Sequence, residues 1–182
     1  LVTIALQQGM GYTAVAAGLA GIPVTVMLAL FSSKVGGLLP TLGARLLLTV
    51  GPLIMAIGMV WLGLMRPGQS YWTGVLPGFL TFAAGLVLVV APVTATALAD
   101  VSADESGTAS GVNNAVARIG SLIAIILLPL VGGLAATQAD GLSTGITILD
   151  GYRTAMIAAA IVCVVGAGLA AVGFNGKDGR VL

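Results

Sequence analysis

The stretch LLLTVGPLIMAIGMVWLGLM, residues 46–65, contains no Asp, Glu, Lys, Arg or His and is bounded by Arg45 and Arg66. An α-helix rises about 1.5 Å per residue, so about 20 apolar residues cross the hydrocarbon core of a bilayer. The stretch has this length, and no charge would lie inside the membrane. It therefore predicts a transmembrane helix.

Four further charge-free stretches share this property, at residues 1–33, 67–99, 119–139 and 154–176. The whole chain is 58% hydrophobic and only 7% charged, whereas soluble domains have about 25% charged residues. A water-soluble fold could not bury this much apolar surface. The sequence therefore predicts an all-α integral membrane protein that contacts the lipid bilayer.

The first stretch must contain two segments, because the glycine-rich turn GMGY interrupts it at residues 9–12. Leu1–Gln8 is interpreted as the end of a preceding span, and the rest of the chain as one transmembrane bundle, 1–182. Because the chain opens on Leu1, we expect it to be part of a longer polypeptide whose N-terminal half is missing here. Five complete spans are predicted, at about 14–35, 46–65, 72–98, 107–136 and 153–174.

Several local signals refine these predicted spans. Pro23 is expected inside the first helix, where the nearby Thr25 hydroxyl could satisfy a freed backbone group. The segments GGLLP and LGAR predict a loop over residues 34–45, and a polar loop is expected to precede the fifth span.

The basic residues divide unequally between the two ends of this bundle. One end is expected to carry Lys34, Arg45, Lys177 and Arg180, with Arg118 at its boundary, and the other Arg66 and Arg153. Cytoplasmic loops are enriched in Lys and Arg, so the first end is predicted to be cytoplasmic. The chain is thus expected in the cell membrane, with a cytoplasmic C-terminus.

The composition argues against enzymatic and metal chemistry. The chain has no His and a single Cys163, and no acidic residue falls inside a predicted span. No GxxxxGK[ST] phosphate-binding loop occurs, and a net charge of +1 is not typical of a nucleic-acid-binding surface. We therefore expect no metal, no cofactor, no nucleic-acid partner and no catalytic site.

The polar residues of the fourth predicted span are the strongest candidates for function. Asn114 and Arg118 are four residues apart and share one helix face, and Asn113 lies beside them. Arg118 has three alternative interpretations: it snorkels to the cytoplasmic interface, bonds the end of a neighbouring helix, or acts on substrate or coupling. Gln7 and Gln8 are either cavity-lining or interfacial. Thr94 either satisfies the backbone freed by Pro92 or faces a substrate path.

Four segments together resemble the C-terminal half of a major facilitator superfamily transporter, most closely the fourteen-span drug:proton antiporter subgroup. The most specific is SGTASGVNNAVARIGS at residues 106–121. The others are ALQQGMGYTAVAAGLAGIP at 5–23, GGLLPTLGARLL at 36–47 and LVVAPVTATALADV at 88–101. In GGLLPTLGARLL, only Gly36, Gly43 and Arg45 retain the family's pattern. Pro40 stands where the family has an acidic residue.

The resemblance implies a six-helix half-bundle, of which five helices are complete here. It further implies proton-coupled efflux of a hydrophobic or amphipathic small molecule by alternating access, with protons handled by the missing half. Cavity candidates are Gln7, Gln8, Thr25, Thr94 and Asn114; conformational or structural candidates are Asn113, Arg118, Gly36, Gly43 and Arg45. Metabolite uptake on the same fold, or a helix bundle without transport activity, are the alternatives.

Overall fold

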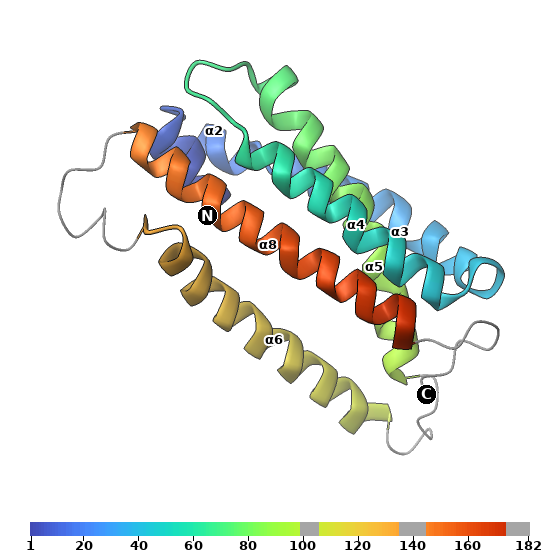
Figure 1. The fold of residues 1–182 in the computed structure, drawn as a ribbon. Helices are drawn as coiled ribbons and strands as arrows, with labels where there is room; N and C mark the ends of the chain where they lie inside the picture. Colours follow the sequence, from blue (N-terminus) through green and yellow to red (C-terminus); the bar gives the residue numbers. More distant parts are fainter. Residues whose placement is uncertain (99–105, 135–144, 174–182) are drawn as a thin grey trace.

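The computed structural model describes residues 1–98, 106–134 and 145–173, and this part of the chain is helical and contains no strand (Figure 1). Short elements form its beginning: α1 (Val2–Ile4), the π-helical turn η1 (Ala5–Gly9) and α2 (Ala14–Leu19). The remaining elements are α3 (Ile22–Leu42), α4 (Ala44–Gly63), η2 (Tyr71–Val75), α5 (Leu76–Leu98), α6 (Ser106–Val131) and α8 (Gly145–Gly173).

Five helical segments are long and apolar enough to cross a membrane, which confirms the predicted all-α membrane bundle. They cover Ala14–Leu42, Ala44–Gly63, Tyr71–Val90, Ser106–Val131 and Thr147–Gly173. Successive long helices run in opposite directions, so the ends of α3, α5 and α8 lie at one end of the bundle (Figure 1). We call this end the Arg45 end and the opposite one the Arg66 end.

The predicted loop over residues 34–45 is wrong, because α3 continues to Leu42 and Gly43 alone separates it from α4. Gly43 has φ +74°, a conformation that side chains disfavour, and its amide bonds the carbonyl of Leu39 at 2.9 Å. GGLLP remains helical although its residues favour turns. In an apolar environment a continuous helix satisfies its own backbone groups, and this requirement outweighs the turn signals.

Pro23 was expected inside a continuous helix, but it lies at the start of one. The chain breaks at Ala20 and Gly21, and Pro23 occupies the first turn of α3, where its missing amide costs no helical hydrogen bond. The hydroxyl of Tyr71 donates to the carbonyl of Ala20 at 3.0 Å. Tyr71, and not Thr25, therefore satisfies the backbone at this break.

The helix bounds also differ at the Arg66 end. α8 begins at Gly145, before the predicted residue 153, because Ile148, Leu149 and Tyr152 are apolar enough to be buried there. α6 ends at Val131, where Gly133 with φ +67° follows, whereas the expected end at residue 136 lies outside the described residues.

Helix α4 lies at the centre and packs against α5 through glycines. A methyl group at Gly85 of α5 would lie 2.5 Å from both the Gly51 carbonyl oxygen and the Met55 amide nitrogen of α4. One at Gly58 would lie 2.5 Å from the Phe82 amide nitrogen. Small residues allow such close approach where no hydrophobic effect drives helices together. The other side of α4 packs against α8.

A compact apolar core lies at the Arg66 end, where η1, α4, η2, α5 and α8 meet. Leu6, Val75 and Tyr152 are among its most buried residues. The Tyr152 hydroxyl is buried and has no hydrogen-bond partner among the residues that the structure describes. An unsatisfied buried hydroxyl costs about 1–3 kcal/mol.

We therefore expect Tyr152→Phe to stabilise the protein by about 1 kcal/mol or more, because it removes this hydroxyl and keeps the packing of the ring. Tyr71→Phe is the matched comparison, since it removes a hydroxyl that is bonded, and it should lower stability by about 1 kcal/mol. Thermal unfolding in detergent measures both effects. Destabilisation by Tyr152→Phe would show that its hydroxyl has a partner in the folded protein.

Candidate functional site

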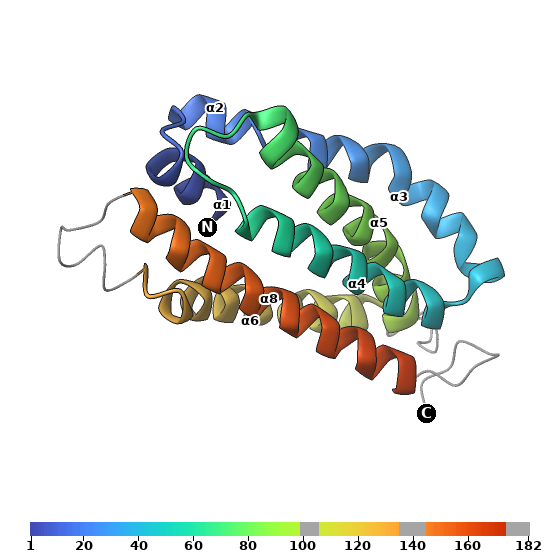
Figure 2. The same ribbon diagram turned by 45° about the horizontal axis from the view of Figure 1, so that its top comes forward.

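The helices α3 and α6 leave most of their surface uncovered. No residue of α6 is buried, and Val35 is the only buried residue of α3, whereas α4 has eight. Both helices contact α5, and α6 also contacts α8 (Figure 2). The uncovered surfaces of α3 and α6 thus flank α5, and we call this region the α3–α5–α6 face.

The α6 part of this face carries the polar residues that the sequence singled out. Asn114 and Arg118 are exposed on the same helix face, and Asn113 is half-buried. None of their three side chains forms a hydrogen bond or ion pair with another residue in the part of the chain that the structure describes. Their polar groups are therefore available to whatever covers this face.

Arg118 lies near the midpoint of α6, about 18 Å from Ser106 at 1.5 Å per residue. It is thus more than three helical turns from the Arg45 end of this helix. The expectation that it marks the boundary of the membrane stays a prediction.

The other cavity candidates do not join Arg118. Thr25 is exposed on α3, while Gln7 is half-buried and Gln8 exposed in η1, which packs against α8 at the Arg66 end. Thr94 is part of α5, but its side chain lies outside the described residues. These candidates are thus distributed over three separate elements. Where their side chains are described, as for Gln7, Gln8 and Thr25, no hydrogen bond joins them.

The conformational candidates lie toward the Arg45 end. Gly36 is half-buried within α3, and Gly43 forms the sharp turn into α4. Arg45 is exposed in the first turn of α4, and its carbonyl accepts a hydrogen bond from the Thr49 hydroxyl at 2.7 Å. Gly43 and Arg45 thus lie at the connection between α3 and α4, whereas Gly36 lies two turns earlier in α3.

Sequence reasoning missed the broken helix at Ala20 and Gly21. A cavity of about 550 Å³ adjoins the break and is lined by Tyr12, Ala16, Leu19, Ala20, Ile22, Pro23 and Tyr71. Discontinuous helices line substrate and ion sites in many transporters. The signal was the Gly21-Ile22-Pro23 sequence, which is typical of a helix start with proline in the first turn.

No protein-family model matches the sequence, but several curated proteins do. The chain is 32% identical over 132 residues to the cephamycin export protein of Amycolatopsis lactamdurans, covering 72% of this chain and 27% of that protein. It is 33% identical over 163 residues to the puromycin resistance protein of Streptomyces alboniger, with 85% and 32% covered. It is also 33% identical over 128 residues to a multidrug resistance protein of Mycobacterium tuberculosis, with 70% and 24% covered.

The fold defines the class of the molecule as a multi-pass, all-α membrane protein. Within this class, the chain is a homologue of a family of transporters that includes antibiotic export and drug resistance proteins. It spans about a third or less of the length of these relatives.

Proposed function

We propose that this chain is part of an exporter of hydrophobic or amphipathic small molecules, of the major facilitator type. The observation that carries the proposal is the α3–α5–α6 face with Asn114 and Arg118 near the middle of a span. An ionisable residue at this height faces protein or a water-filled path, because lipid would leave its charge unsolvated. The drug export and resistance functions of the relatives support the same conclusion.

The rest of the polypeptide would cover this face. In transporters built from two helical halves, substrate binds near the bilayer midplane between the halves, and rocking of the halves exposes it to alternate sides. The height of Arg118 fits such a midplane site. We propose that Asn114 and Arg118 line it, together with Thr25 and Thr94 of the neighbouring helices, and that Gln7 and Gln8 lie nearer to the Arg66 end.

The basic residues support one orientation of the bundle. Lys34 and Arg45 lie toward the Arg45 end, and Lys177 and Arg180, which lie outside the described residues, follow α8 along the chain, whereas Arg66 and Arg153 lie at the other end. This bias supports a cytoplasmic Arg45 end and a cytoplasmic C-terminus. Export would then carry substrate from the Arg45 end toward the Arg66 end.

Coupling to protons and membership of the fourteen-span subgroup extend the same proposal. Asp150 is the only acidic residue among the described residues, and it lies exposed at the Arg66 end. A carboxylate that exchanges protons near the midplane would therefore be supplied by the rest of the polypeptide.

Efflux from cells that express the full-length protein tests this proposal. Cells preloaded with a fluorescent amphipathic drug should lose it faster than cells without the protein, and a protonophore should abolish the difference. Drug accumulation unchanged by the protein, together with faster uptake of one nutrient, would instead establish the uptake alternative. No effect on any solute would favour a helix bundle without transport activity.

A further inference from the structure

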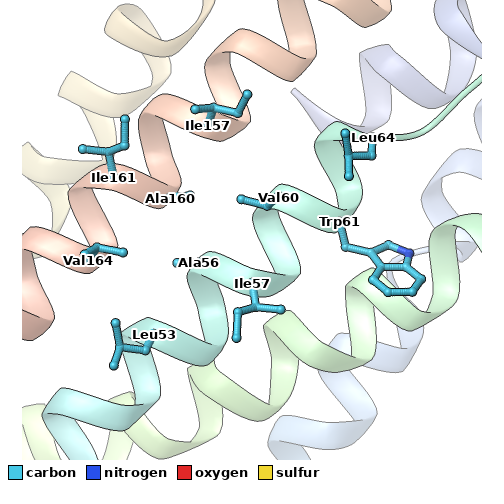
Figure 3. A pocket seen from close by; sticks show the side chains of 10 residues that line it. All are labelled: Leu53, Ala56, Ile57, Val60, Trp61, Leu64, Ile157, Ala160, Ile161 and Val164. Atoms are coloured by element: carbon cyan, nitrogen blue, oxygen red, sulfur yellow. The ribbon is translucent and has the colours of Figure 1, made fainter.

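A long apolar groove lies on the outside of the bundle, between α4 and α8. It has a volume of about 660 Å³, and every residue that lines it is apolar or aromatic (Figure 3). The two small residues Ala56 and Ala160 are buried at its base, whereas the larger side chains are exposed along its sides. The lining residues are Leu53, Ala56, Ile57, Val60, Trp61, Leu64, Ile157, Ala160, Ile161 and Val164.

The groove has the length of one lipid chain. From Leu53 to Leu64 it follows α4 for about 16 Å at 1.5 Å per residue. One leaflet contributes about half of the hydrocarbon thickness of about 30 Å, which is nearly the same length. The indole of Trp61 donates its N–H to the Gly74 carbonyl at 3.1 Å, so its polar atom is satisfied and its ring can contact an acyl chain.

A basic pocket adjoins the groove at the Arg66 end. Leu64 lines both, and the pocket of about 190 Å³ is further lined by Gly63, Met65, Arg66, Pro67, Leu149, Asp150 and Arg153. Arg153 lies level with the end of α4, because a methyl group at Gly63 would lie 3.6 Å from the Arg153 Cα. Neither arginine forms an ion pair within the described part of the chain, although Asp150 shares the pocket. The pocket therefore has one net positive charge.

We propose that this groove and pocket form a binding site for one phospholipid with an anionic headgroup. The acyl chain lies along the groove, and the headgroup phosphate binds Arg66 and Arg153. Basic pockets between transmembrane helices bind anionic headgroups, and this pocket adjoins one end of the groove through Leu64. The site lies between α4 and α8 and is separate from the α3–α5–α6 face that we propose as the substrate path.

Trp61 provides a direct test, because bromine atoms on an acyl chain quench a tryptophan that they contact. The probe is the full-length protein with Trp61 as its only tryptophan, in phosphatidylcholine vesicles that contain a minor share of phosphatidylglycerol. At equal mole fraction, brominated phosphatidylglycerol should quench Trp61 with about fivefold higher apparent affinity than brominated phosphatidylcholine, as expected for one net charge. This measurement does not depend on transport.

The double variant Arg66→Gln and Arg153→Gln should lose this preference, so that both lipids quench equally. Arg45→Gln is the matched control, because Arg45 is equally exposed but lies at the other end of α4, and it should retain the preference. Equal quenching of the unaltered protein by both lipids would overturn the proposal. Quenching that disappears as protein density in the vesicles rises would also overturn it, since a second copy would then cover the groove.

Discussion

Replacing Gly85 by valine is expected to destroy most of the folded bundle. The first atom of the new side chain would lie 2.5 Å from backbone atoms of Gly51 and Met55, and backbone cannot move aside by a rotamer change. Overpacking of well-packed interiors costs about 1–3 kcal/mol and occasionally more, and here α4 and α5 would have to separate. We expect the cost to exceed about 3 kcal/mol. The fraction of detergent-extracted protein that elutes as a monodisperse peak measures the loss.

Gly168→Val is the matched control for this prediction. Gly168 lies within α8, and a methyl group placed there meets no heavy atom within 4 Å. The same change of residue type in the same kind of helix should therefore leave the yield of folded protein nearly unchanged. Equal losses for both variants would mean that valine acts through helix propensity and not through the contact between α4 and α5.

Replacing Arg118 by alanine in the full-length protein is expected to lower export by about tenfold or more, which corresponds to about 1.4 kcal/mol of lost transition-state stabilisation. The reason is its height near the middle of α6, where a guanidinium is solvated only by protein, substrate or water. Membrane insertion should be unaffected, because the substitution removes a charge from an apolar span. Initial efflux rates at matched protein level provide the measurement.

Two further variants separate the roles of this side chain. Arg118→Lys keeps the charge but loses the planar set of five donors, so it should also lower export if Arg118 makes several directed hydrogen bonds. Asn114→Ala removes a neutral amide from the same helix face and should have a milder effect. Normal export by both Arg118 variants would show that the residue only reaches the headgroups.

The spans were predictable where charges mark their ends. Arg45 and Arg66 mark the ends of the second predicted span, and α4 runs from Ala44, one residue before Arg45, to Gly63, three residues before Arg66. Prediction failed where turn-forming residues are helical, as in the loop expected after Lys34. It also failed at α8, whose first two turns are stabilised by burial of Leu149 and Tyr152 in a core that sequence periodicity does not reveal.

The candidate site was predictable only in part. The spacing of Asn114 and Arg118 was enough to place both on one helix face, since a helix has 3.6 residues per turn. The start of the fourth span was predicted at residue 107, and α6 begins at Ser106. The groove between α4 and α8 could not be predicted, because it depends on which helices are neighbours.

The absence of buried residues in α6 has a consequence for biosynthesis. The turn after α6 touches α8 at Gly132 and Gly151, but α6 itself has no core of its own to anchor it. In the proposed transporter, the remaining polypeptide would cover α6 and complete its packing. A destabilising substitution in the remaining polypeptide should then leave α6 accessible to membrane proteases. These proteases would cleave within α6, although α6 itself carries no substitution, and the whole molecule would be degraded.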